Sequence, residues 1–227
     1  MKLADAQGVK QRLIELAVDI TGIASIDRFD NTPSGFHPTD IIKDCQSVIV
    51  FGIRFPNSTL SGSSQAAYTF VRNRLMDQVD SVAFQLAKEL EEEGKWAVPI
   101  PSSEPYEFWD EARQHGRGIL SLKHAAVLAG MGQLGKNTLL VNDRFGNMLW
   151  LSAVLVDAAY EADPLATYRT CPPDCRICLQ ACPAQALDGV TIEQRKCRSV
   201  SGKYSPGGGG VYACNLCRKI CPRRCGI

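Results

Sequence analysis

The opening segment of the chain alternates between helical and strand patterns of hydrophobic residues. Apolar side chains first recur every three or four residues, which predicts an amphipathic helix. These positions are Val9, Leu13, Leu16, Ala17 and Ile20. Residues 47–55 (SVIVFGIRF) then form a β-branched run that stops at Pro56, which is typical of a central strand.

A second helical pattern predicts a long helix with one apolar face, ended by Gly94. Its apolar positions are Val71, Leu75, Val79, Val82, Leu86 and Leu90. Further predicted elements are a strand at 96–100, a helix at 118–129, and strands at 138–142 and 148–157 joined by a hairpin-type turn. We therefore expect an α+β protein in which residues 1–160 form a first, α/β domain, with a linker near 158–170.

Composition is that of an ordinary globular protein of one or two domains. The 227 residues are 45% hydrophobic and carry a formal net charge of +1. No stretch approaches the roughly 20 apolar residues that span a bilayer. Residues 1–10 are polar and lack the apolar core of a signal peptide, which predicts a cytoplasmic location.

Two cysteine runs follow the predicted linker and share the pattern C-x2-C-x3-C-P. The first run comprises Cys171, Cys175, Cys178 and Cys182, and the second comprises Cys197, Cys214, Cys217 and Cys221. In ferredoxins with two [4Fe–4S] clusters, the last cysteine of each run binds the other cluster. We expect one cluster on Cys171, Cys175, Cys178 and Cys221, and the other on Cys197, Cys214, Cys217 and Cys182, within a ferredoxin-like domain at 170–227.

Zinc and disulfides are the alternatives for these cysteines. Zinc sites usually show two separate Cys-x2-Cys pairs, without the third cysteine and the proline seen here. Disulfides are rare in a reducing compartment. Cys171 departs from the usual spacing, since three residues separate it from Cys175. Cys45 is expected to be a small buried residue, and Cys225 could replace Cys221 as a ligand.

Charge is distributed unevenly along the chain. Nine Lys and Arg against three Asp and Glu follow residue 170, a bias that can indicate nucleic-acid binding. Two clusters of roughly −2 charge each would balance most of this excess. We therefore expect no nucleic-acid partner.

Residues 129–142 (AGMGQLGKNTLLVN) bring Gly130, Gly132 and Gly135 next to Lys136. The segment is not a Walker loop, because Ser or Thr does not follow the lysine. It is not a dinucleotide fingerprint either, because the glycines follow a predicted helix and precede a strand. A tight helix-to-strand turn and a ligand-binding turn both remain open.

The order of 47–55, the long helix, AGMGQLGKNTLLVN, RFGNMLWLSAVLVDA and the two cysteine runs resembles the epoxyqueuosine reductase family and, more distantly, reductive dehalogenases. The resemblance implies a nitroreductase-like domain that holds cobalamin and a ferredoxin domain that supplies it with electrons. By position it implies corrinoid contacts from Gly132, Gln133, Leu134, Gly135, Lys136, Asn137, Phe145 and Gly146.

Three departures accompany the resemblance. The family's proposed proton donor, an aspartate, has Gly116 at its position here, and the C-terminal helical-repeat domain and the dehalogenase export signal are missing. These departures favour a short relative of unassigned substrate.

Candidate proton donors lie nearby in the sequence. They are Tyr106, Asp110 and His124, with Glu107, Glu111 and His115 beside them. Asp110 and its acidic neighbours are also typical of a solvated surface, and His124 of a half-buried structural histidine. The predicted function is an iron–sulfur, corrinoid-dependent reductase of a small organic substrate that receives electrons from a donor protein. The alternative is an electron carrier, or a protein that reduces a corrinoid, without substrate chemistry of its own.

Overall fold

The computed structural model describes residues 2–227. Its elements up to residue 100 are α1 (Ala6–Glu15), β1 (Ile20–Ser25), η1 (Ile26–Phe29), α2 (Pro38–Ile41), β2 (Ser47–Arg54), η2 (Asn57–Leu60), α3 (Gln65–Glu92) and β3 (Ala97–Ile100). The remaining elements are β4 (Phe108–Asp110), β5 (His115–Arg117), α4 (Leu122–Leu128), β6 (Gln133–Leu134), β7 (Leu140–Val141), β8 (Leu149–Val156), α5 (Ile177–Ala181), α6 (Gln194–Ser201), β9 (Gly202–Tyr204), β10 (Gly210–Tyr212) and α7 (Leu216–Lys219).

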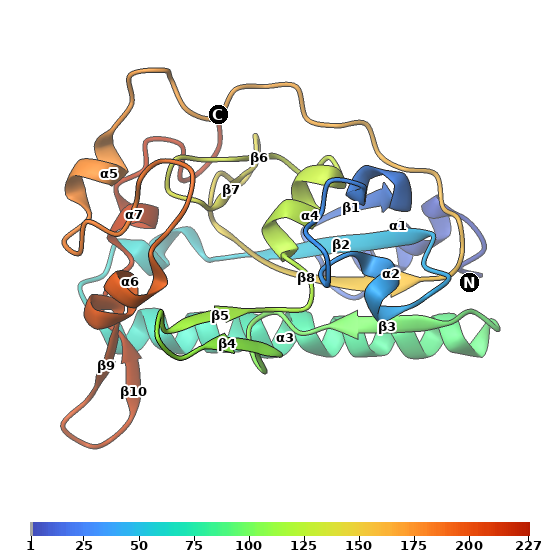
Figure 1. Ribbon diagram of the computed structural model, residues 1–227, viewed down its shortest axis with the longest axis horizontal. Coiled ribbons are helices and arrows are strands. Elements are labelled where there is room, and N and C mark those ends of the chain that lie inside the picture. The colour runs from blue at the N-terminus through green and yellow to red at the C-terminus, as the bar shows by residue number, and fades with distance from the viewer. Residues whose placement is uncertain (1) are drawn as a thin grey trace.

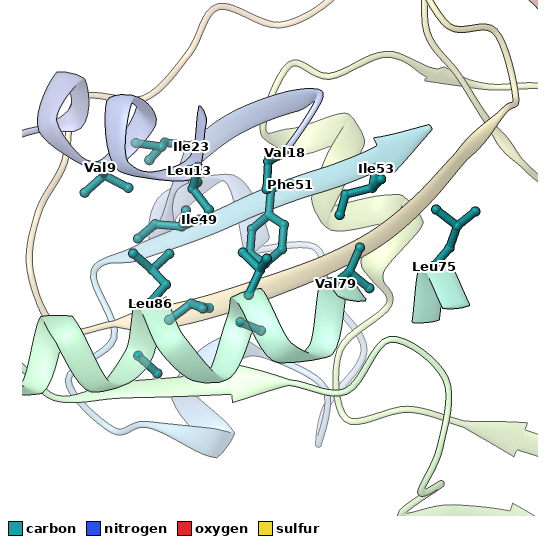
Figure 2. Close-up of a cluster of buried hydrophobic side chains, with 14 of the residues drawn as sticks. Val9, Leu13, Val18, Ile23, Ile49, Phe51, Ile53, Leu75, Val79 and Leu86 are labelled. Carbon is teal, nitrogen blue, oxygen red and sulfur yellow. The ribbon is translucent and has the colours of Figure 1, made fainter. Parts of the chain in front are cut away.

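One antiparallel sheet in the order β1–β2–β8–β3 forms the centre of the molecule. Alternate residues of β2 point to opposite faces of the sheet. Ile49 and Phe51 pack against α1 and α3 (Figure 2), and Val48 and Val50 pack toward α4. The sheet therefore lies between two helical layers, and β2 is buried along nearly its whole length.

The long helix α3 confirms the predicted helical pattern. Ser64 caps its N-terminus by accepting a hydrogen bond from the backbone N–H of Ala67 at 3.1 Å. Gly94 follows its C-terminus with φ of +81°, the left-handed conformation that glycine adopts readily. Although α3 has 28 residues, no helix of the described chain is long and apolar enough to cross a membrane.

Two sequence predictions are corrected. The apolar pattern at the start continues to Ile20, but α1 ends at Glu15 and Ile20 begins β1, a strand that the pattern concealed. Strands β7 and β8 do not pair with each other, because β7 pairs with β6 and β8 joins the central sheet. The turn from Asn142 to Gly146 therefore connects two different sheets.

The cysteine-bearing helices α5, α6 and α7 gather at one end of the molecule (Figure 1). The strand β10 packs beside the start of α3. There the backbone N–H of Tyr212 donates to Oγ1 of Thr69 at 2.9 Å, and Nε2 of Gln65 donates to the carbonyl of Ala213 at 3.2 Å. Residues 170–227 are thus attached directly to the sheet-containing part of the chain.

Candidate redox site

The cysteine runs fold so that thiols from both runs meet. Burial raises the pKa of the Cys178 thiol, and the nearby thiols of Cys171, Cys221 and Cys175 raise it further. Burial also raises the pKa of Cys221, and the thiols of Cys171 and Cys175 raise it further. The last cysteine of the second run therefore lies among the first three of the first run.

The remaining four cysteines form a second group. Burial raises the pKa of Cys197, and the thiols of Cys214 and Cys182 add to that shift. Burial likewise raises the pKa of Cys217 to about 11, with a further contribution from Cys197 and Cys214. The helices α5 and α7, which carry Cys178 and Cys217, pack against each other. The structure thus gathers the same two sets of four that the spacing grouped, and their role as ligands stays a prediction.

Within each group, the thiols of the described chain lie too far apart to bind one metal ion together. Within residues 2–227, no three His, Cys, Asp or Glu side chains lie close enough to hold one metal ion. A closed zinc site needs four thiolates about 2.3 Å from one ion. All ten cysteines lie in the described chain and none forms a disulfide. Cys45 is buried, as predicted, and Cys225 is exposed.

Hydrogen-bond donors surround the first group of thiols. The backbone N–H of Lys136 donates to Sγ of Cys171 at 3.4 Å. Hydrogen bonds from the backbone of Arg223 and the side chain of Asn147 oppose the burial that raises the pKa of Cys221. Such contacts stabilise thiolates, and in clusters they help set the reduction potential.

A buried arginine lies against the second group. Arg218 is 7% exposed, follows Cys217, and stacks over the ring of Phe55 at 4.7 Å. Its guanidinium donates to the carbonyl of Asn147, and within the described residues it has no carboxylate partner. A buried unpaired cation is costly, and an anionic cluster beside it would offset that cost. Spacing alone indicated neither Arg218 nor Asn147.

Segment 132–137, predicted to contact a corrinoid, also makes contacts with other parts of the chain. A Cβ on Gly132 would lie 2.5 Å from the carbonyl oxygen of Val141, and one on Gly135 would lie 2.8 Å from Oδ1 of Asn137. Nε2 of Gln133 donates to the carbonyl of Ala166 at 2.6 Å, and Leu134 accepts from the hydroxyl of Thr170 at 3.0 Å. The room expected beside the glycines is filled by protein.

Two other predicted corrinoid contacts, Asn137 and Gly146, lie against the cysteine segment. Nδ2 of Asn137 donates to the carbonyl of Cys217 at 3.2 Å. A Cβ on Gly146 would lie 2.1 Å from the carbonyl oxygen of Arg223. Phe145, next to Gly146, packs at the edge of the apolar cluster under α4. Asn137 and Gly146 therefore connect the sheet-containing part of the chain to the cysteine segment.

Aromatic side chains line two adjoining hollows beside β4 and β5. One hollow has a volume of about 540 Å³ and is lined by Glu104, Pro105, Tyr106 and Trp109. The other, of about 410 Å³, is lined by Phe36, Glu107, Phe108, Trp109, Asp110, His115 and Arg117. Trp109 belongs to both, and it is 45% exposed. We call this pair of hollows the aromatic hollow.

The aromatic hollow lies next to α6, which carries Cys197. The guanidinium of Arg198 stacks over Tyr106 at 5.4 Å and Trp109 at 5.1 Å. Gln194 accepts from the N–H of Gly116 at 3.1 Å and donates to its carbonyl at 2.9 Å. The second cysteine group is therefore held close to the hollow.

The proton-donor candidates separate in space. Tyr106 fills the room above Gly116, where a Cβ would meet its ring at 2.9 Å, and its hydroxyl accepts from Arg198 at 3.3 Å. Asp110 also lines the aromatic hollow. His124 lies on α4 with Nδ1 2.6 Å from the hydroxyl of Ser121, outside the hollow's lining.

Comparison with known proteins confirms the resemblance. No family model matches the chain. It is 26% identical to an epoxyqueuosine reductase of Staphylococcus aureus over 98% of this chain and 66% of that protein. It is 25% identical to one from Lactococcus garvieae over 87% of this chain and 57% of that protein. The chain thus spans two thirds or less of the length of these relatives.

Solved structures share the fold. An epoxyqueuosine reductase from Streptococcus thermophilus matches with a TM-score of 0.68 and 19% identity, covering 97% of this chain and 66% of that one. A reductive dehalogenase, studied for its B12-dependent dehalogenation, matches with a TM-score of 0.68 and 20% identity over 96% of this chain and 31% of that one. Another epoxyqueuosine reductase (TM-score 0.64, 18% identity, covering 96% of this chain and 64% of that one) was solved with a tRNA stem loop. The chain therefore shares the fold of these proteins.

Proposed function

We propose that the protein is a reductase in which two [4Fe–4S] clusters deliver single electrons to an acceptor bound in the aromatic hollow. The observation that carries the proposal is the gathering of eight thiols from two runs into two groups of four. The donor set fits iron–sulfur clusters, which take four thiolates each. The unpaired, buried Arg218 also fits an anionic neighbour.

Within this proposal, residues 170–227 act as a ferredoxin-like module that follows the sheet-containing domain. Cys171, Cys175, Cys178 and Cys221 would hold the first cluster. Cys182, Cys197, Cys214 and Cys217 would hold the second. A donor protein would supply electrons to one cluster and the second would pass them on, since Cys197 lies on the helix that borders the hollow.

The residues of the aromatic hollow have distinct roles in this proposal. Trp109 and Tyr106 offer flat apolar surfaces to a planar acceptor. The guanidinium of Arg198 stacks over both rings and donates a hydrogen bond to the Tyr106 hydroxyl, which fixes the position of that hydroxyl. That hydroxyl can donate a proton to a reduced acceptor, and Arg198 would stabilise the phenolate that remains. Asp110 is the other candidate donor at the hollow.

Cobalamin is the organic cofactor that the resemblance implies, and when bound it would supply one-electron chemistry for reduction of a substrate. At two of the residues it implies, Gly132 and Gly135, the space on the side of a Cβ is filled by Val141 and Asn137. The aromatic hollow, about 540 Å³ and 410 Å³ in its two parts, borders α6, the helix that carries Cys197. Cob(II)alamin is therefore the first acceptor to test there.

Anaerobic purification followed by iron, sulfide, zinc and cobalt analysis tests the clusters. We expect brown protein with roughly eight iron and eight sulfide per chain. Stoichiometric zinc without acid-labile sulfide would overturn the proposal.

Titration with cob(II)alamin, followed by its absorption spectrum, tests the hollow. We expect binding at tens of micromolar that Trp109→Ala weakens and that Trp96→Ala, a change at an exposed tryptophan outside the hollow, leaves unchanged. Wild-type protein that holds both clusters and binds no cobalamin would favour the electron carrier. The filled space at Gly132 and Gly135 is the observation that favours this second candidate.

A further inference from the structure

Lys136 makes an unusual set of contacts for a residue of a glycine-rich turn. Its ammonium nitrogen donates to the carbonyl oxygens of Pro173 at 2.5 Å, Cys175 at 3.0 Å and Pro172 at 3.4 Å. An ammonium group has three protons to donate. One lysine from the sheet-containing part thus binds three carbonyls of the loop between the first two cysteines of the first run.

That loop is the place where the first run departs from the usual ferredoxin spacing. Three residues, two of them proline, separate Cys171 from Cys175. Proline has no N–H, so the loop has few donors of its own; the N–H of Cys175 donates to the carbonyl of Pro172 at 3.1 Å. The carbonyls turn together toward one point, and Lys136 supplies the donor there.

Lys136 also contacts the thiol at the start of the loop. Its backbone N–H donates to Sγ of Cys171 at 3.4 Å. The ammonium group therefore brings a positive charge to the same loop that holds a predicted thiolate. A nearby cation and an N–H···S bond both favour the more negative, reduced form of a cluster, which raises its reduction potential.

We propose that Lys136 is a positioning residue for the first cluster: it closes the extended Cys171–Cys175 loop and raises the reduction potential of that cluster. This role differs from the corrinoid contact that the resemblance implied for Lys136. The inference rests on the proposed iron–sulfur function and adds to it the residue that makes the longer spacing workable.

Three variants test the role under anaerobic conditions, with iron analysis, paramagnetic resonance and redox titration of each cluster. Lys136→Met removes donor and charge, Lys136→Gln keeps a donor without the charge, and Lys136→Arg keeps both. The control Lys10→Met removes another partly buried lysine, which pairs with Asp163 at 2.5 Å, away from the cysteine loops.

We expect Lys136→Met to lose the first cluster, so that iron falls from roughly eight to roughly four per chain while the second cluster keeps its signal. Lys136→Gln should retain both clusters with a lower potential for the first, and Lys136→Arg and Lys10→Met should match the wild type. If Lys136→Met does not fold, the potential of Lys136→Gln decides the question.

Wild-type iron content in Lys136→Met together with an unchanged first potential in Lys136→Gln would overturn the inference while leaving the proposed function intact. Wild-type protein without any iron–sulfur cluster would instead overturn the proposed function, and the inference with it.

Discussion

Residues 2–157 and residues 170–227 differ in what lies at their centres. The first part places two apolar clusters on the two faces of one sheet. Beyond residue 169, the buried hydrophobic residues of the described chain are Cys178 and Ala186. A segment with so little apolar core needs other cross-links to hold one structure. Under the proposed function, thiol ligation would order the second part together with docking onto the sheet-containing part.

Removal of iron should therefore affect the folding of the two parts differently. We expect a chelator and oxidant to leave residues 2–157 folded while residues 170–227 lose protection, because metal binding is coupled to the folding of small metal domains. Hydrogen exchange read by mass spectrometry on cluster-loaded and iron-free protein measures this. Equal loss of protection across the whole chain would contradict the comparison.

Replacement of Cys221 by Ala tests how the second part is cross-linked. Its thiol lies with Cys171, Cys175 and Cys178, so we expect the cluster of the first run to be lost and that of Cys197, Cys214 and Cys217 to remain. Paramagnetic resonance distinguishes the two.

A surviving first cluster has two explanations, and Cys225 is the exposed thiol four residues away. The double replacement of Cys221 and Cys225 separates them: loss of the cluster means that Cys225 had replaced Cys221, and its survival means that the grouping is wrong.

A buried core side chain of the first part should contribute more to the free energy of unfolding than any apolar side chain of the second part. Phe51 is fully buried between the sheet and α3 (Figure 2), and Phe51→Ala should cost about 3–5 kcal/mol of unfolding free energy. Val190→Ala, at an 82% exposed position, should change it by less than about 0.5 kcal/mol. Urea unfolding of the cluster-loaded protein under anaerobic conditions measures both.

The same contrast explains which elements the sequence predicted. Hydrophobic periodicity located α1, α3 and β2, because each buries a continuous apolar face. It missed β4 and β5, since every residue of β4 is exposed and leaves no alternation to detect. It also extended the first helix across Ile20, because a buried strand position fits a helical repeat equally well over so short a stretch.

The site shows a similar division. Cysteine spacing identified the two runs, since the pattern is local in each, and the exchange of last cysteines known from two-cluster ferredoxins grouped the eight thiols. The contacts of Gln194 with Gly116 and of Arg198 with Tyr106 join residues 78 and 92 positions apart. Their neighbours are set by tertiary packing, so no local pattern indicated them. For the same reason the glycines at 132 and 135 suggested a ligand where the chain itself fills the space.

Gln194 links the two parts through two hydrogen bonds with Gly116, and their loss should have a moderate effect on local stability. Gln194→Ala removes both hydrogen bonds to Gly116, and we expect a loss of about 1–3 kcal/mol in the local opening free energy of β4–β5. Hydrogen exchange of that hairpin reports the change. Glu193→Ala, which removes an exposed ion pair with Lys196 on the same helix, is the matched control and should leave the exchange unaltered.

The smallest expected effect is a pH dependence of thermal stability that arises from His124 in the first part. Burial lowers the pKa of His124 below its usual 6.5, and Lys123 lowers it further. The unfolded chain therefore binds a proton more readily than the folded chain, so stability contributed by neutral His124 is present above pH 6.5 and is lost as pH falls through the lowered pKa. We expect the Tm of the iron-free protein to fall by about a few degrees between pH 7 and pH 5, and by less in His124→Gln. An identical fall in His124→Gln and the wild type would show that the acid sensitivity arises elsewhere in the chain.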